Sequence, residues 1–219
     1  FSLPVRKQKT LLLTGVPESL AAEKLKNWEE NAGRDIRIAY LPSPGILRLR
    51  LSISGNNENQ LIEKLNQSGQ EIVSIFGRKH FFGVDNETLQ EIVGKLLKHK
   101  AKTLALAESC TGGNIAQLIT SVPGSSKYFV GSLVAYSNEI KIGQLGVSRD
   151  TIESHGAVSQ EVVEKMAKGI RKLMHTDFAV ATSGIAGPDG GSKEKPIGTT
   201  WIAVSSENKL VSGKFFLGE

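Results

Sequence analysis

The residues best suited to chemistry form the segment Ala107-Glu-Ser-Cys-Thr-Gly-Gly113, which ends an apolar run. A strand that ends in small polar residues and two glycines before a helix presents backbone N–H groups and the positive end of the helix dipole. Ser109 or Cys110 could act as a nucleophile there, and the amides near Gly112 and Gly113 could stabilise an oxyanion. The same residue types also suit a simple helix cap, because Ser and Thr cap helices and glycine permits a tight turn.

A second segment, Tyr136-Ser-Asn-Glu-Ile-Lys141, again follows a strand-like run and begins a helix. The helix dipole disfavours a positive charge in the first turn and lowers the pKa of a lysine placed there. A lysine that acts as a base near neutral pH needs a pKa about two to three units below 10.4, or about 3–4 kcal/mol of differential solvation. Partial burial beside glycine-rich backbone could supply this. An exposed Lys141 on an amphipathic helix and an edge aromatic at Tyr136 are the alternatives.

A third strand-like run ends at Thr182-Ser-Gly-Ile-Ala-Gly-Pro-Asp-Gly-Gly191. A glycine-rich loop can approach a ligand closely because it lacks side chains, although a purely structural loop fits the same composition. Open α/β sheets bind ligands beyond the carboxyl ends of their strands. We therefore expect the three strand ends to converge on one crevice. The chain contains no G-x-x-x-x-G-K-[ST] sequence, so a P-loop nucleotide triphosphatase is not supported.

The elements that position these segments follow from apolar periodicity. From a helix capped by Asp85 or Asn86 onward, the sequence predicts strands at 103–107, 131–136, 178–182, 199–205 and 210–216, and helices at 112–120, 138–145 and 160–174. This alternation predicts an α/β fold, a three-layer αβα sandwich in which helices cover both faces of a mixed sheet.

The first 83 residues predict a smaller α+β domain with the order βαββα. A strand at 10–16 precedes a helix that opens at Pro17, and two alternating runs at 36–40 and 47–53 form a hairpin around the turn 42–45. One or two helices follow, through Ile75. We place the domain boundary near 81–84, so that the two domains span residues 1–83 and 84–219.

Composition narrows the class of protein. The chain has 219 residues with 39% hydrophobic and 22% charged residues, which excludes a disordered chain, and no apolar run approaches the roughly 18 residues of a membrane helix. The single cysteine excludes an internal disulfide and fits a reducing, cytoplasmic compartment, and four scattered histidines predict no metal site. Residues 1–83 hold 12 basic and 8 acidic residues, a net +4, but the acids are interleaved, so we expect no nucleic-acid surface and no membrane contact.

The three segments closely resemble the C-terminal domain of the CinA family of competence/damage-inducible proteins. The resemblance covers about residues 84–219 and includes Val122-Pro-Gly-Ser-Ser126, Gly156-Ala-Val-Ser159, Met166-Ala167 and Lys195-Pro196 besides the three segments above. Residues 1–83 resemble the KH-like middle region of long family members, at Gly15-Val-Pro-Glu-Ser19 and Leu47-Arg-Leu-Arg50.

The resemblance implies hydrolysis of the carboxamide of nicotinamide mononucleotide (NMN) to nicotinic acid mononucleotide and ammonia, without a cofactor or metal. It implies that Ser109 is the nucleophile, that Lys141 is its general base, and that Tyr136 assists proton transfer or holds the lysine. Backbone N–H groups of Thr111, Gly112 and Gly113 would form the oxyanion hole. The implied nucleotide pocket is lined by Ser137, Asn138, Ser183, Gly184, Ala186, Gly187 and Thr199. The family's habit of dimerising implies a homodimer.

The sequence differs from the family pattern in two places, and other functions stay open. The KH-like region has Pro42-Ser-Pro-Gly45 in place of a G-x-x-G loop, so we do not expect RNA binding. Long family members carry a further N-terminal domain and continue past the last strand with a Gly-Asp/Asn-Arg segment and a helix, so we expect a chain cut at Phe1 and truncated after Glu219. The alternatives are nucleophilic attack by Cys110, a non-catalytic nucleotide-binding or scaffold module, and an RNA-binding adaptor that acts through residues 1–83.

Overall fold

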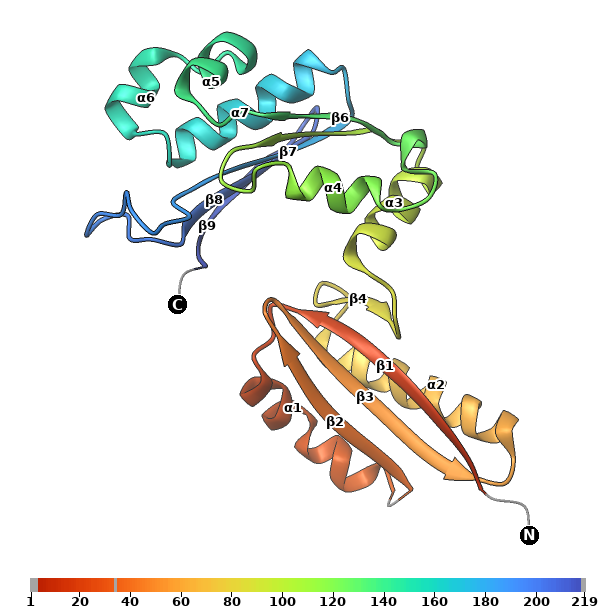
Figure 1. The fold of residues 1–219 in the computed structure, drawn as a ribbon. Helices are drawn as coiled ribbons and strands as arrows, with labels where there is room; N and C mark the ends of the chain where they lie inside the picture. Colours follow the sequence, from red (N-terminus) through yellow and green to blue (C-terminus); the bar gives the residue numbers. More distant parts are fainter. Residues whose placement is uncertain (1–3, 34, 218–219) are drawn as a thin grey trace. The chain divides into compact units, whose positions relative to one another are not determined.

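A computed structural model of the chain describes residues 4–33 and 35–217 (Figure 1). The chain divides into two compact units, Phe1–Ile92 and Val93–Glu219, which are described here one at a time. None of the helices within the described ranges is long and apolar enough to cross a membrane.

The N-terminal unit is built on one four-stranded antiparallel sheet with the strand order β2-β3-β1-β4. The predicted hairpin is formed by β2 and β3, and the residues after it form one helix, α2. The first strand begins earlier than expected, because Val5 already pairs with Gly55 of β3. The elements are β1 (Val5–Thr14), α1 (Glu18–Asn31), β2 (Ile36–Ser43), β3 (Ile46–Gly55), α2 (Glu58–Phe76) and β4 (Phe81–Val84).

Both helices of this unit pack on the same face of the sheet. Alternate residues of β1 and β3 point to that face and are buried against apolar side chains of α1 and α2. Full burial of each leucine contributes about 1.5–3 kcal/mol, so this one-sided core defines which face of each strand points inward. The buried side chains are Leu11, Leu13, Ala21, Leu25, Leu47, Leu49, Leu51, Ile53, Leu61, Leu65, Ile72 and Phe76.

The helix after β4 starts later than the sequence predicts. Helix α3 spans Leu89–His99, and Thr88 rather than Asp85 or Asn86 lies at its start. The Thr88 hydroxyl accepts a hydrogen bond from the Glu91 amide, and the Glu91 carboxylate accepts one from the Thr88 amide at 2.8 Å, which forms a capping box. The carboxylate of Asp85 is already engaged, because it accepts a hydrogen bond from the Thr10 amide at 2.9 Å.

The C-terminal unit has the predicted α/β architecture around a mixed sheet of order β6-β5-β7-β8-β9. Strand β5 runs parallel to β6 and β7, whereas β8 runs antiparallel to both of its neighbours, β7 and β9. The remaining elements are β5 (Leu104–Glu108), α4 (Asn114–Thr120), a 3₁₀ turn (Ser125–Lys127), β6 (Phe129–Val134), α5 (Asn138–Leu145), α6 (Arg149–His155), α7 (Gln160–Leu173), β7 (Phe178–Gly184), β8 (Thr199–Ser205) and β9 (Leu210–Phe216).

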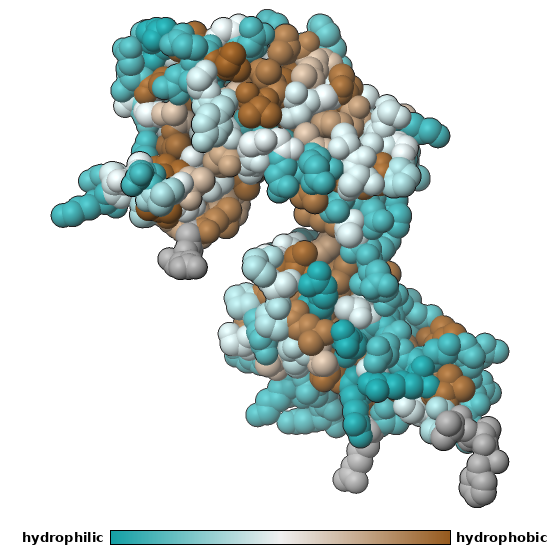
Figure 2. All heavy atoms as spheres, in the orientation of Figure 1, coloured by the Kyte–Doolittle hydropathy of each residue, from teal (hydrophilic) through white to brown (hydrophobic). Residues whose placement is uncertain are grey.

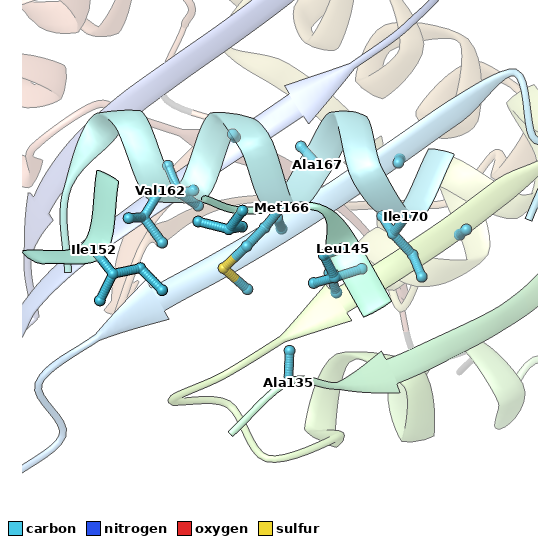
Figure 3. Close-up of a cluster of buried hydrophobic side chains, with 14 residues drawn as sticks. Ala135, Leu145, Ile152, Val162, Met166, Ala167 and Ile170 are labelled. Atoms are coloured by element: carbon cyan, nitrogen blue, oxygen red, sulfur yellow. The ribbon is translucent and has the colours of Figure 1, made fainter. Parts of the chain in front are cut away.

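Helix α7 lies across one face of this sheet and forms its main core, part of which Figure 3 shows. The strands present small residues to the helix, among them Ala105, Ala107, Ala179, Ala181 and Ala203, while α7 supplies the larger Met166 and Ile170. A Cβ on Gly169 would lie 2.0 Å from the Leu145 carbonyl oxygen, so only glycine lets α7 pack this closely against the end of α5. Residues of α3 and α4 cover the opposite face over β5 and β7, and there the apolar Val204, Val211 and Phe215 of β8 and β9 remain exposed.

Candidate active site

The carboxyl ends of β5 and β7, together with the residues that follow β6, surround a cavity of about 310 Å³. Parallel pairing of β5 with both neighbours brings these three strand ends to one edge of the sheet. Eight residues predicted for the site line this cavity: Ser109, Tyr136, Asn138, Lys141, Ser183, Gly184, Ala186 and Gly187. Cys110, the alternative nucleophile, lines it as well. Five residues that the sequence analysis did not predict for the site complete the lining: Ala157, Val158, Ile185, Asp189 and Gly190.

Lys141 is the centre of this site. The side chain is only 2% exposed, and its ammonium nitrogen lies 3.2 Å from Ser109 Oγ, 2.8 Å from the Ala135 carbonyl oxygen and 3.1 Å from the Tyr136 carbonyl oxygen. Ser137 begins α5 as its N-cap, which places Lys141 in the first turn, facing back toward the end of β6. None of the three oxygen atoms that surround the amine carries a formal charge.

This arrangement favours a neutral amine. Burial lowers the pKa of Lys141, and proximity to the Cys110 thiol acts weakly in the opposite direction. A neutral amine has two N–H donors and one lone pair, which matches two carbonyl acceptors and one hydroxyl. The two N–H groups can donate to the carbonyls of Ala135 and Tyr136, and the lone pair can accept the Ser109 hydroxyl proton.

Ser109 itself lies just beyond the end of β5 and is 8% exposed. Its amide donates to the Thr182 carbonyl oxygen at 3.1 Å, which continues the pairing between β5 and β7 by one residue. The nucleophile predicted from the sequence is therefore attached to the sheet backbone rather than to a loose turn. A rigid attachment of this kind holds a reacting oxygen at a fixed distance from its base.

Glu108 is a residue of this site to which the sequence analysis gave no role. It is 1% exposed, and its carboxylate accepts hydrogen bonds from the amides of Gly113, Ile115 and Ala116 at 3.1, 3.0 and 2.8 Å. It thus satisfies the amides at the start of α4, where the helix dipole favours negative charge. A glutamate at the end of an apolar strand, five residues before Gly113, is the signal in the sequence that could have indicated it.

The predicted oxyanion hole is wrong in two of its three members. The Gly113 amide donates to Glu108, and the Gly112 amide donates to the Ser109 carbonyl oxygen at 3.1 Å, so neither is available to an oxyanion. Over the described part of the chain, the amides of Cys110 and Thr111 have no backbone acceptor. Both amides also favour negative charge on the Cys110 sulfur. The available donors therefore come directly after Ser109, ahead of the glycine pair.

Ser137 and Thr199, which were predicted to line the nucleotide pocket, stabilise the local fold instead. The Ser137 hydroxyl accepts a hydrogen bond from the Ile140 amide at 3.3 Å and caps α5. Thr199 is fully buried, and its carbonyl oxygen accepts from the Ile185 amide at 2.9 Å, which closes the base of the loop between β7 and β8. Neither side chain lines the cavity.

Tyr136 contributes to the site through its backbone. Its carbonyl oxygen accepts from Lys141, which agrees with a role in holding the lysine. The side chain is 76% exposed, and its hydroxyl forms no hydrogen bond with any described residue. Tyr136 is among the residues that line the cavity, but no hydrogen bond joins its hydroxyl to Lys141 or Ser109, so the geometry gives no support to proton transfer by the phenol.

The loop between β7 and β8 forms the far wall of the cavity and packs tightly against the nucleophile's neighbour. A Cβ on Gly184 would lie 2.9 Å from Cys110 Sγ, from the Thr199 carbonyl oxygen and from Thr200 Oγ1. The Ser183 hydroxyl donates to the Ala157 carbonyl oxygen at 2.8 Å. Asn138 and Asp189 are the lining residues whose side chains offer an amide and a carboxylate.

Cys110 is the chain's only cysteine and lies partly buried beside Ser109. Burial raises the pKa of its thiol, although nearby amides, Thr182 and Lys141 act in the opposite direction. A raised pKa reduces the fraction of the reactive thiolate, so the geometry and the charge state both favour Ser109 as the nucleophile. No group of three His, Cys, Asp or Glu side chains that could bind a metal ion occurs among residues 4–33 and 35–217.

Comparison with known proteins assigns both units to described families. Residues 86–219 match the model of the CinA C-terminal domain, and residues 8–83 match that of the damage-inducible protein CinA KH domain. The CinA-like protein of Flavobacterium psychrophilum is 43% identical over 219 residues, which is 100% of this chain and 52% of that protein. The CinA-like protein of Cytophaga hutchinsonii is 44% identical over 99% of this chain and 52% of its own length. The chain therefore spans about half the length of the curated relatives it matches.

Solved structures resemble about three-fifths of the chain. The competence/damage inducible protein CihA from Agrobacterium tumefaciens is 37% identical with a TM-score of 0.58, covering 59% of this chain and 79% of that one. The competence damage-inducible protein A (ComA) from Klebsiella pneumoniae is 34% identical with a TM-score of 0.58, covering 60% of this chain and 81% of its own.

Proposed function

Because the chain belongs to the CinA family, we propose that its C-terminal unit hydrolyses the carboxamide of NMN, giving nicotinic acid mononucleotide and ammonia. The observation that carries this proposal is the distance of 3.2 Å between Lys141 Nζ and Ser109 Oγ inside a cavity. A buried lysine with only neutral acceptors is the arrangement that a Ser/Lys hydrolase requires of its base.

In the first step the Ser109 oxygen attacks the carboxamide carbon, and its proton moves to the neutral Lys141 amine. The carbonyl oxygen becomes an oxyanion, which the amides of Cys110 and Thr111 stabilise. Removing one such donor from an oxyanion hole costs about 10²–10³-fold in turnover, so two available amides are a substantial contribution.

In the second step the tetrahedral intermediate collapses. The Lys141 ammonium gives its proton to the leaving nitrogen, the C–N bond breaks, and ammonia departs from a nicotinoyl ester of Ser109. Water then attacks this ester while Lys141 accepts a proton from it, and the same proton returns to Ser109 as the C–O bond breaks. The sum is NMN plus water giving the acid and ammonia, and the enzyme is restored.

The size and lining of the cavity suit a mononucleotide. Its volume of about 310 Å³ lies at the lower end of ligand sites, which span about 300–1,000 Å³. The side chains of Asn138 and Asp189 offer hydrogen-bonding groups for ribose hydroxyls, and the backbone of Gly184 to Gly187 allows a flat ring to approach closely. Independence from a metal or other cofactor, the homodimer and the cytoplasmic location remain predictions.

An ammonia-release assay on NMN with single variants tests the proposal. We expect Ser109→Ala to lower turnover at least about 10³-fold, and Lys141→Arg to lower it about 10²–10⁴-fold because arginine cannot act as a neutral base. Cys110→Ala should remain active, and Glu153→Gln on the exposed surface of α6 serves as the matched control.

Three outcomes would contradict this assignment. Activity that survives Ser109→Ala but is lost in Cys110→Ala would make the thiol the nucleophile. NMN binding measured by calorimetry, without ammonia release by the unmodified chain, would favour a non-catalytic nucleotide-binding module. Turnover that survives Lys141→Arg would exclude the lysine as the base.

A further inference from the structure

We propose that a hollow of about 960 Å³ in the C-terminal unit binds a polyphosphate group, that is, two or more linked phosphates. The cationic side chains that would hold it are Lys168, Arg171, Lys172 and Lys209. The hollow shares no lining residue with the candidate active site. The proposal therefore does not depend on the hydrolysis proposed for that site.

The hollow lies at the edge of the sheet where β5 and β7 begin, whereas the candidate active site lies where these strands end. Strand β8 ends at this edge and β9 begins there, because β8 runs antiparallel to both of its neighbours. Helix α7 leads to the same edge, since residues 174–177 join its last turn to β7 (Figure 1). The end of α7, the start of β7 and the turn between β8 and β9 therefore surround one hollow.

Positive charge dominates the lining of the hollow. Five Lys or Arg residues and two Asp or Glu residues line it, a net charge of +3. One of the acids, Asp177, is already neutralised: its carboxylate lies 2.6 Å from Lys102 Nζ and accepts hydrogen bonds from the Thr103 amide and hydroxyl, both at 2.9 Å. These bonds, first of all the one from Lys102, lower the pKa of Asp177 to about 2. With this ion pair set aside, four cations and the single acid Glu207 remain.

The four remaining cations have no partner of opposite charge in contact with them. Over the described part of the chain, none of them forms an ion pair or a side-chain hydrogen bond. Glu164, one helical turn before Lys168, accepts hydrogen bonds from Gln160 and Ser212 instead. Like charges three and four residues apart on a helix repel each other, so an anion between them would be stabilising.

The dipole of α7 accounts for only part of this cluster. Cations are favoured in the last turn of a helix, where carbonyl oxygens lack partners, and Arg171 and Lys172 occupy that turn. The carbonyl oxygens of Ile170, Arg171 and Lys172, however, already accept from backbone amides that follow the helix, at 3.0, 3.1 and 3.4 Å. Lys168 lies before the last turn and Lys209 lies on another element, so the dipole explains neither.

Arg171 carries the observation that points most directly to an anion. Its side chain is half-buried, and its Nε–H group is buried without a hydrogen-bond acceptor among the described residues. Buried donors nearly always have an acceptor, so this one calls for an explanation. A guanidinium binds phosphate through two parallel N–H···O bonds, and Nε can supply one of them. A phosphate in the hollow, with the Arg171 side chain turned toward it, would provide that acceptor.

The number of cations and the size of the hollow indicate more than one phosphate. A single phosphate ester carries a charge of about −1.5 to −2, which two cations neutralise, whereas four cations suit two or three linked phosphates. The volume of about 960 Å³, against about 310 Å³ for the candidate active site, lies at the upper end of ligand sites. Lys168 and Lys172 lie one helical turn apart, so successive phosphates can contact successive cations.

The hollow does not suit an apolar partner. On the face that Figure 2 shows, apolar residues of this unit gather around β6, where Val130 and Val134 are exposed. None of the exposed large apolar side chains within the described ranges lines the hollow. The one aromatic residue of the lining, Phe178, packs against the core under α3 and α4 and offers no free ring on which a base could stack. Recognition therefore rests on the phosphates.

Isothermal titration calorimetry of the full chain with sodium tripolyphosphate, ATP and AMP, in buffer with EDTA and about 0.15 M salt, tests the proposal. We expect one site per chain, with similar affinities for tripolyphosphate and ATP. AMP has a single phosphate and should bind at least about tenfold more weakly, because it forms fewer charge-assisted hydrogen bonds.

Variants of the lining place the site. Lys168→Gln/Lys172→Gln should lower the affinity for tripolyphosphate at least about tenfold, since it removes two charged donors. Glu207→Gln removes the one acid of the lining that has no ion pair and should raise the affinity by up to about fivefold. The matched control is Lys127→Gln/Lys193→Gln, which removes two exposed lysines of the same unit outside the hollow. Its charges are screened at this salt concentration, so it should keep the affinity within about twofold.

The proposal is overturned if neither tripolyphosphate nor ATP binds, if AMP binds as tightly as ATP, or if the control loses as much affinity as Lys168→Gln/Lys172→Gln. A weaker affinity in Glu207→Gln would also overturn it. If the lining variant weakens binding as expected, a preference for ATP assigns the site to a nucleotide, and a preference for tripolyphosphate assigns it to inorganic polyphosphate. Circular dichroism checks that each variant is folded.

Discussion

Replacing Glu108 by alanine should destabilise the C-terminal unit by several kcal/mol. The carboxylate is buried and accepts three amide hydrogen bonds of 2.8–3.1 Å from the start of α4. Hydrogen bonds to a charged group contribute about 1.5–3 kcal/mol each. Gly113 and Ile115 are partly accessible to water, which can replace part of the loss, so we expect about 3–5 kcal/mol in all.

Glu108→Gln separates the charge of the side chain from its shape. The side-chain amide oxygen can still accept hydrogen bonds from the amides of α4, but the negative charge at the start of that helix is lost. The NH₂ group would face backbone N–H groups, which are donors too and cannot bond to it. We expect a loss of about 1–2 kcal/mol, between the wild-type protein and Glu108→Ala. Glu153→Gln, an exposed carboxylate on α6, is the matched control and should change stability by less than about 0.5 kcal/mol.

Urea unfolding measured by tryptophan fluorescence gives these differences. In a Trp28→Phe background the only remaining tryptophan is Trp201 on β8, so the signal reports on the C-terminal unit alone. For a chain of this size the alanine variant should lose about 6–20 °C in Tm. The reasoning fails if Glu108→Ala unfolds within 0.5 kcal/mol of the parent protein, because the three hydrogen bonds would then contribute no net stability.

Three further outcomes follow from the site. Because burial lowers the pKa of Lys141, kcat/KM should rise with pH through that pKa and then level off, and a turnover that does not change between pH 6 and pH 9 would argue against a neutral lysine as the base. The same burial affects the free energy of folding: the cost of burying the ammonium form is fully present below the pKa of the folded protein and diminishes as pH rises toward 10.5, the ordinary value. Tyr136→Phe should retain its turnover in the ammonia assay, because the lysine is held by the Tyr136 carbonyl, and a loss of about 10²-fold would assign proton transfer to the phenol. Gly184→Ala should lower both Tm and turnover, since its Cβ would overlap Cys110 Sγ and two atoms of β8, and overpacking of this kind costs about 1–3 kcal/mol; unchanged melting would show that the loop adapts.

The sequence was a good guide to the elements and to the edge of the sheet that carries the site. Apolar runs followed by small polar residues mark the ends of β5, β6 and β7, and the spacing of α5 places Lys141 in a first turn. What could not be inferred is which polar atoms would already be engaged. Gly112 and Gly113 look available in the sequence because a glycine pair carries no sign of what its amides bond to. The Gly112 amide donates to the Ser109 carbonyl oxygen and the Gly113 amide to Glu108, and only the position of that glutamate could have indicated the second of these bonds.

The distribution of charge over the folded N-terminal unit was the feature that the sequence predicted least well. A count of basic and acidic residues over 1–83 gives +4 with the two signs interleaved, which predicts an ordinary solvated surface. The sheet alternates its side chains between two faces, and both helices lie on one of them, so residues adjacent in the chain point to opposite sides. Arg6 and Lys7 illustrate this, because only Lys7 reaches an acidic partner.

The hydrogen bonds of Glu108 with α4 and those of Ser109 with Lys141 have to be kept apart for the mechanism to work. Glu108 and Ser109 are consecutive, and a carboxylate in contact with Lys141 would stabilise the ammonium form and remove the base that the mechanism requires. Strand alternation prevents this, because consecutive side chains point to opposite faces: Glu108 turns to the amides of α4 and Ser109 to Lys141. The acid therefore stabilises a helix end, and the amine is left among neutral oxygens. It follows that Glu108→Gln should lower stability and leave the pH at which turnover is half-maximal unchanged, whereas a shift of that pH would show that the carboxylate acts on the lysine directly.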